Sequence, residues 1–167
     1  MIKKISKQYD NFANKFSINQ RYENRTNITK FREQLNFNFK NKKVIDFGCG
    51  DGYELKFLKR KGAIVYGFDS SKEMVNLAKK NLKGEQIKEG LFEKVPFESN
   101  LFDFVISKYA LQTSRNIEPI YKEIVRVLKK KGYLIFLVVH PLRQFIEKKK
   151  KTISKKKLLN LESLKIN

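Results

Sequence analysis

The amino-acid sequence predicts an α/β protein with a doubly wound, mainly parallel sheet of about five strands and helices on both faces. Between residues 43 and 139, short apolar runs alternate with stretches of helical periodicity, and the loops that join them are short. Such alternation specifies right-handed crossovers between parallel strands. The 167 residues suit one domain with a buried core, and the 41% hydrophobic content exceeds that of a disordered chain.

The first forty residues are expected to form a helical cap. Apolar residues recur at intervals of mostly three and four within residues 5–16, and a weaker helical pattern follows over 21–35. We therefore divide the chain into a cap at 1–40 over the entrance to the site, a core at 41–142 and a lysine-rich tail at 143–167. The three parts make one domain overall.

The core contains five predicted strands and three predicted helices. The strands are 44–47, 63–68, 86–89, 102–107 and 133–139, and the helices are 53–61, 71–81 and 117–128. Gly62 stands where the carboxyl end of a helix favours glycine, and Ser70 or Ser71 provides a cap for the second helix. Residues 129–132 are the predicted turn into the last strand.

A glycine-rich turn follows the first strand. Gly48, Gly50 and Gly52 occupy alternate positions. Glycine has no Cβ, so these residues can take positive φ angles and let a ligand approach bare backbone amides. Asp69 ends the second strand about twenty residues later, where an acidic residue usually accepts ribose hydroxyls. Its alternative role is to cap the helix that begins at Ser71.

The spacing and charge of this turn separate two classes of cofactor. A dinucleotide site prefers G-x-G-x-x-G, whereas the glycines here are one residue apart. Asp46 and Asp51 would repel a pyrophosphate and would attract a ligand that carries an ammonium and a sulfonium. The turn therefore favours S-adenosylmethionine. Ligands of parallel sheets bind beyond the carboxyl ends of the strands, which places 48–52, Asp69, 90–93, 107–112 and His140 around one crevice.

Four segments resemble the class I S-adenosylmethionine-dependent methyltransferases over about residues 9–141. They are 44–52, 67–74, 95–107 and 123–133. The resemblance implies a Rossmann-like fold whose sheet usually has seven strands, and the last two strands are not evident after His140. We therefore expect a chain that is short at its C-terminus. The edge of the fifth strand would be covered by the tail or by another chain, or would be exposed in a truncated form.

The resemblance also implies roles for single residues. The resemblance implies that Asp46 orders the turn and helps to hold the amino group of the cofactor. Gly48 and Gly50 would let the methionine portion of the cofactor approach the backbone. The other residues placed around the cofactor are Cys49 as a small filler of the turn, Asp69 at the ribose, Ser70 and Met74 beside the adenosine, Leu91 and Phe92 at the adenine in place of an acidic residue, and Ser107 beside the reacting methyl.

Methyl transfer from a sulfonium is an in-line displacement, so alignment of the acceptor supplies much of the acceleration. A base is needed only where the acceptor loses a proton. His140 and Tyr109 are the candidates for such a base or for substrate binding, with ordinary strand-end and packing roles as alternatives. The favoured function is a methyltransferase that acts on a small-molecule acceptor.

The net charge of +20 raises a nucleic-acid alternative. An RNA methyltransferase could use the lysine-rich tail as an electrostatic arm, but no base-reading motif follows the fourth strand at 107–110. A bias of genome composition would give the same lysine content. A third alternative is a protein that binds the cofactor without turnover. Self-association through the fifth strand is the remaining predicted interaction.

The setting is predicted to be cytoplasmic and free of metal. Cys49 is the only cysteine, so neither an intramolecular disulfide nor a multi-cysteine metal site can form. Polar residues arrive early in the chain where a signal peptide would be apolar, so no export signal is expected. The longest apolar run, 133–139, is far below the roughly twenty residues that span a bilayer, and no membrane partner is predicted.

Overall fold

A computed structural model of the chain describes residues 7, 10, 13 and 36–139. The chain divides into two units, Met1–Leu137 and Val138–Asn167, and every helix and strand named below belongs to the first. Most of the predicted N-terminal cap, the lysine-rich tail and His140 lie outside the described residues. None of the helices in the described part is long and apolar enough to cross a membrane.

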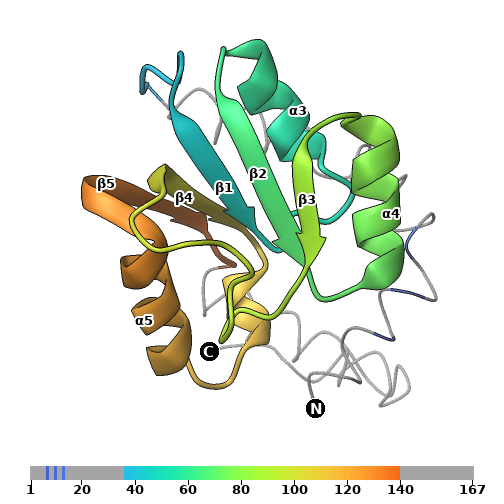
Figure 1. The fold of residues 1–167 in the computed structure, drawn as a ribbon. Coiled ribbons are helices and arrows are strands. Elements are labelled where there is room, and N and C mark those ends of the chain that lie inside the picture. Colours follow the sequence, from blue (N-terminus) through green and yellow to red (C-terminus); the bar gives the residue numbers. More distant parts are fainter. Residues whose placement is uncertain (1–6, 8–9, 11–12, 14–35, 140–167) are drawn as a thin grey trace, which may run out of the picture. The chain divides into compact units, whose positions relative to one another are not determined.

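The described residues form one sheet of five parallel strands (Figure 1). The strands are β1 Lys43–Phe47, β2 Ile64–Asp69, β3 Gln86–Glu89, β4 Phe102–Lys108 and β5 Leu128–Leu137. Their order across the sheet is β3-β2-β1-β4-β5. The α/β parallel architecture predicted from the alternation of apolar runs and helical stretches is therefore confirmed.

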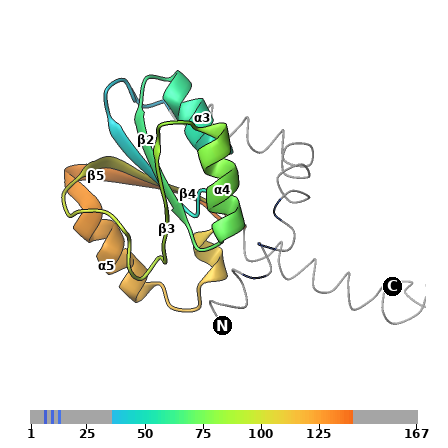
Figure 2. The same ribbon diagram turned by 45° about the vertical axis from the view of Figure 1, so that its right-hand side comes forward.

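Three α-helices of the described residues cover the two faces of this sheet. Helices α3 (Tyr53–Arg60) and α4 (Lys72–Asn81) lie on one side, and α5 (Glu118–Val127) lies on the other (Figure 2). One buried cluster joins Leu55 and Val75 of the first side to Val44 of the sheet. A second joins Ile120 of α5 to the opposite face. Burial on both faces explains why the central strands are nearly continuous apolar runs.

Short local signals set the ends of the helices. The Ser71 hydroxyl accepts a hydrogen bond from the Met74 amide at 3.2 Å, so Ser71 is the N-cap of α4 as predicted. Gly62 follows the last turn of α3 with a φ of 83°, which is the left-handed conformation that glycine favours after a helix.

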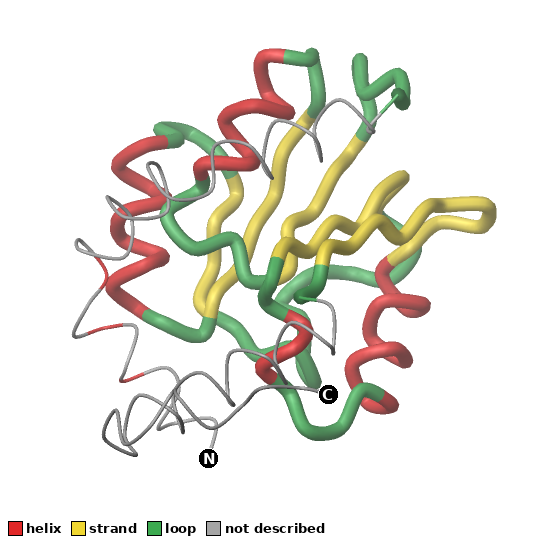
Figure 3. The backbone as a smooth tube through the Cα atoms, turned by 180° about the vertical axis from the view of Figure 1, so that it is seen from behind, coloured by secondary structure: helices red, strands yellow, loops and turns green. Residues whose placement is uncertain are grey.

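Strand β5 differs from its prediction. It begins at Leu128, directly after α5, and ends at Leu137, whereas the predicted strand ran from 133 to 139 after a turn (Figure 3). The predicted start is wrong because Leu128 already pairs with Phe102, and the register with β4 shifts between Phe102 and Phe104. In the described sheet β5 is an edge, and its residue Tyr133 is 54% exposed.

Candidate functional site

The loop between β1 and α3 is held open by its glycines. Gly48, Gly50 and Gly52 have φ angles of 77°, 52° and 79°, which confirms the expected positive φ at all three. The amides of Gly48 and Cys49 both donate to the Phe68 carbonyl, at 3.1 and 3.0 Å. A Cβ on Gly48 would lie 2.5 Å from the Cβ of Ala110, so the loop lies too close to Ala110 for any larger residue at position 48.

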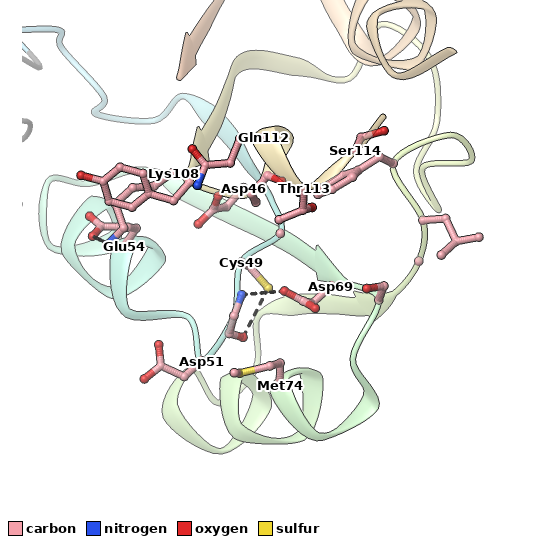
Figure 4. Close-up of a pocket in the computed structure, with 18 of the residues that line it drawn as sticks. Asp46, Cys49, Asp51, Glu54, Asp69, Met74, Lys108, Gln112, Thr113 and Ser114 are labelled. Atoms are coloured by element: carbon pink, nitrogen blue, oxygen red, sulfur yellow. Dashed lines mark hydrogen bonds and ion pairs between the residues drawn. The ribbon is translucent and has the colours of Figure 1, made fainter. Parts of the chain in front are cut away.

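This loop borders a cavity of about 350 Å³ at the carboxyl ends of the strands (Figure 4). The volume falls in the range of small-molecule sites, about 300 to 1,000 Å³. The residues predicted from the sequence that line it are Asp46, Gly48, Cys49, Gly50, Asp69, Ser70, Met74, Leu91, Phe92 and Tyr109. Residues far apart in the chain therefore meet around one crevice, as expected for a parallel sheet.

The cavity is acidic, although the whole chain carries a net charge of +20. Its charged lining residues are Asp46, Asp51, Glu54, Asp69 and Glu93, against Lys108. Five carboxylates and one ammonium favour a ligand that bears positive charge and disfavour a pyrophosphate. The charge of the cavity thus differs in sign from that of the chain that forms it.

Backbone amides hold the carboxylate of Asp69. Its Oδ2 accepts from the Gly50 amide at 3.0 Å, and its Oδ1 accepts from the Ser71 amide at 2.9 Å. Burial raises the pKa of Asp69, and the hydrogen bonds from Ser71, Gly50 and Ser70 oppose that rise. A carboxylate has about four acceptor sites, so Asp69 can still accept hydroxyl donors from a ligand.

A further contact continues this network to the N-terminal region. The Ser71 hydroxyl donates to Oδ1 of Asp10 at 2.6 Å, and the Glu73 amide donates to the same oxygen at 3.3 Å. Asp10, Ser71, Asp69 and Gly50 are therefore linked one to the next.

Asp46 lies near the end of β1 with 2% of its surface exposed, and its Oδ1 has no hydrogen-bond partner among the described residues. Burial raises its pKa to about 8; the nearby Glu54 and Asp69 add to the rise and Lys108 opposes it. A buried polar atom without a partner is uncommon and requires an explanation. Its place in the cavity wall makes a ligand group the natural partner.

Lys108 and Glu54 form an ion pair in the same cavity. Lys108 is the last residue of β4, Glu54 lies in the first turn of α3, and Nζ and Oε1 are 2.5 Å apart. The two side chains are only 9% and 7% exposed. Neither residue was predicted from the sequence to belong to the site. The carboxyl-end rule had placed 107–112 at the crevice, which was the available signal for Lys108.

Ser107 is the exception among the predicted cofactor residues. It is not part of the cavity wall, and its hydroxyl donates to the Phe47 carbonyl at 2.9 Å, which ties β4 to β1. Alternate residues of a strand point to opposite faces, so Lys108 takes the place at the cavity that was expected for Ser107.

Cys49 is buried in the loop. Burial, followed by the charges of Asp46 and Asp69, raises the pKa of its thiol well above the ordinary value. A thiol kept in its neutral form is a poor nucleophile, which agrees with a filling role for this side chain.

The remaining wall comes from the loops after β3 and β4. Leu91 is 40% exposed, and the Phe92 ring packs against the rings of Phe47 and Phe68 with centroids 6.4 and 6.0 Å apart. Tyr109 has a φ of 59°, and its amide donates to the Leu137 carbonyl at 2.7 Å. A non-glycine residue held in this conformation is strained, and such strain clusters at functional sites.

Comparison with known proteins identifies the family. The family described as "Methyltransferase domain" matches residues 45–136, which span the sheet from β1 to β5. The chain belongs to the class I S-adenosylmethionine-dependent methyltransferases. Its resemblance to that family, stated above from four sequence segments, is confirmed.

Curated relatives of this chain are named after different methyl acceptors. A demethylmenaquinone methyltransferase from Thermotoga maritima is 30% identical over 80% of this chain and 60% of its own. A malonyl-[acyl-carrier protein] O-methyltransferase from Buchnera aphidicola is 28% identical over 81% of this chain and 51% of its own. This chain thus spans a little over half the length of these two curated relatives.

Solved structures agree with the fold of this chain. A protein from Pyrococcus horikoshii is 29% identical, with a TM-score of 0.67 over 78% of this chain and 64% of that one. A methyltransferase from Thermotoga maritima, described as a possible histamine N-methyltransferase, is 24% identical, with a TM-score of 0.70 over 86% of this chain and 68% of that one. The second likeness is evidence for the fold alone.

Proposed function

We propose that this methyltransferase binds S-adenosylmethionine in the cavity beside the glycine loop and transfers its methyl group to a small-molecule acceptor. The acidic cavity that holds the unpartnered Oδ1 of Asp46 is the observation that carries the proposal. The cavity has five acidic side chains against one ammonium, so it favours a ligand that carries positive charge.

The residues present fit this cofactor. Asp69 is positioned by two backbone amides and keeps acceptor sites for the ribose hydroxyls. Asp46 offers an unsatisfied oxygen to the ammonium of the amino-acid portion. Leu91 and Phe92 supply apolar contact for the adenine, next to Met74 and Ser70 on the same wall.

When bound, S-adenosylmethionine supplies an electrophilic methyl on a sulfonium, and the electron pair of the broken bond stays on sulfur. The protein has to hold the acceptor atom in line with that bond and to exclude competing water. Tyr109, Gln112 and Thr113 line the part of the cavity that follows β4, and we assign acceptor binding to this part. Tyr109 is the described candidate for contact with the acceptor, and His140 stays a prediction outside the described residues.

The test follows the transferred methyl group. The protein is incubated with methyl-labelled S-adenosylmethionine and a cell extract separated into small-molecule, RNA and protein fractions, with Asp69→Ala as the matched control. We expect label in the small-molecule fraction with the wild-type protein and none with the variant. Label confined to a ribonuclease-sensitive fraction would overturn the small-molecule acceptor and favour the RNA alternative that the net charge of +20 raised.

Binding without transfer is the third outcome. Calorimetric titration with S-adenosylmethionine is run beside the labelling experiment, because it reports the cofactor separately from the acceptor. A clear binding isotherm with no label in any fraction would replace the proposal by a cofactor-binding protein without turnover. No binding at any concentration tested would overturn the proposed cofactor itself.

A further inference from the structure

Three buried charged groups meet at one side of the cavity. Asp46 comes from β1, Glu54 from α3 and Lys108 from the end of β4 (Figure 4). The Lys108 ammonium bonds to Oε1 of Glu54, while Oδ1 of Asp46 has no partner among the described residues. Lys108 therefore balances one of the two carboxylates directly.

The imbalance has an energetic consequence. An ionised carboxylate buried without a partner is strongly unfavourable, and removal from water is the largest cost. Two species can relieve that cost at Asp46: a proton on the carboxyl group or a cation beside it. Only one of them is needed at a time, so a bound cation and the proton compete.

We propose that Lys108 is a positioning residue that, together with Glu54, sets the protonation of Asp46, so that binding of the cofactor's ammonium beside Asp46 releases a proton from Asp46 to solvent. This inference rests on the proposed function. It adds that the cavity exchanges one positive charge for another, the proton for the ammonium of the ligand. No bond other than the O–H bond of Asp46 is broken in the exchange.

The groups that face Asp46 decide the direction of each effect. Glu54 on α3 and Asp69 at the end of β2 favour its protonated form, whereas Lys108 favours its ionised form. The Cys49 thiol of the glycine loop stays neutral, because burial raises its pKa. With a pKa of about 8, Asp46 carries its proton in the unliganded protein at neutral pH.

Two variants with opposite effects separate this role from a merely structural one. Lys108→Met removes the charge that favours ionisation, so the pKa of Asp46 should rise. Glu54→Gln removes a charge that favours protonation, so the pKa of Asp46 should fall. Lys108→Arg keeps the positive charge, so the pKa of Asp46 should stay close to its value in the wild-type protein. Damage to the fold would weaken ligand binding in both variants without moving the pKa in opposite directions.

The first readout needs no ligand. NMR of protein labelled at the aspartate carboxyl carbons follows the titration of Asp46, with Asp46→Asn used to assign its signal. We expect the midpoint to move up in Lys108→Met and down in Glu54→Gln relative to the wild type. Midpoints that move in the same direction, or an Asp46 that titrates at its ordinary acidic value, would overturn the inference.

The second readout counts protons. Calorimetric titration of the wild-type protein with S-adenosylmethionine at pH 7, in buffers of different ionisation enthalpy, should show release of about one proton per ligand bound. The affinity should rise about tenfold between pH 6 and pH 7. Binding without proton release would overturn this inference alone, whereas no binding at either pH would overturn the proposed function and the inference with it.

Discussion

Asp46 and Asp69 lie at the ends of neighbouring strands and line the same cavity, but their carboxylates are held in different ways. Both oxygens of Asp69 accept backbone amides, one from the glycine loop and one from the start of α4. Oδ1 of Asp46 accepts no hydrogen bond from the described residues, and the charges around it come from the side chains of Glu54, Lys108 and Asp69. Burial raises the pKa of both aspartates.

The two carboxyl groups differ in what satisfies them: the protein backbone satisfies Asp69, and a ligand would satisfy Asp46. Asp69 is satisfied by the backbone that it also organises, because its hydrogen bond to Gly50 ties the loop to β2. Asp46 is left for a partner that the described residues do not supply. Loss of Asp69 should therefore harm both the loop and ligand binding, whereas loss of the Asp46 charge should harm ligand binding and help the unliganded fold.

The largest expected effect is on cofactor affinity in Asp69→Ala. The variant loses the ribose acceptor, the hydrogen bond from the glycine loop and the hydrogen bond from the start of α4, so S-adenosylmethionine should bind at least about 100-fold more weakly, or about 3 kcal/mol. Calorimetry measures the affinity. The matched control is Asp103→Ala, an aspartate that accepts the Lys43 amide at 2.8 Å and does not line the cavity. Equal affinity in Asp69→Ala and wild type would contradict the assignment.

The second prediction separates stability from binding at Asp46. In the folded protein its pKa is raised from 3.8 to about 8, so between these values the folded protein holds a proton that the unfolded chain releases. The contribution of Asp46 to the free energy of unfolding is therefore present in acid and is lost as the pH rises to about 8, by up to about 1.4 kcal/mol per pH unit.

Asp46→Asn removes this loss because its amide does not ionise. The variant should become progressively more stable than the wild type as the pH rises from 5 to 8, while its affinity for S-adenosylmethionine falls about tenfold or more. Urea unfolding of both proteins at several pH values measures the difference. A variant that is less stable than the wild type at pH 8 would show that Asp46 is satisfied in the unliganded fold.

The smallest expected effect tests how far the Asp69 network extends. Asp10 accepts the Ser71 hydroxyl at 2.6 Å, and the Ser71 amide bonds to Asp69. Asp10→Ala should weaken cofactor affinity by about two- to fivefold, or about 0.5 to 1 kcal/mol, since the two hydrogen bonds that it removes, from Ser71 and Glu73, act on the cofactor only indirectly. The exposed Lys7 provides the control, because Lys7→Ala changes the same region without touching the network. A loss as large as that of Asp69→Ala would give Asp10 a direct role.

The sheet was predictable from sequence because apolar runs and helical periodicity alternate from 43 onward. The glycine loop and Asp69 were predictable for the same reason, since their spacing follows the end of a strand. The sequence could not predict that Lys108, and not Ser107, lines the cavity. The last residue of a strand is uncertain by one position, and a shift of one position moves a side chain to the opposite face of the sheet. Sequence also gave no sign that Glu54, in a first helical turn, would be buried against a lysine.

The predicted start of β5 was wrong for a related reason. Residues 129–131 are three lysines, which indicate a turn in the sequence, yet the strand already begins at Leu128. Leu128 pairs with Phe102 and Tyr133 pairs with Phe104, so residues 129–132 bulge out opposite one residue of β4, and Lys131 has a φ of 66°. The bend that these residues indicate is present, but it lies inside the strand and not before it.

A crystal structure of the protein with S-adenosylhomocysteine tests the central claim most directly, because it locates both ends of the ligand at once. We predict that the ribose hydroxyls donate to Asp69 and that the amino-acid end lies beside Asp46, with the backbone bonds from Gly50 and Ser71 to Asp69 retained. A ligand whose ribose lies away from Asp69, or whose ammonium has no contact with Asp46, would contradict the division of the cavity between these two aspartates.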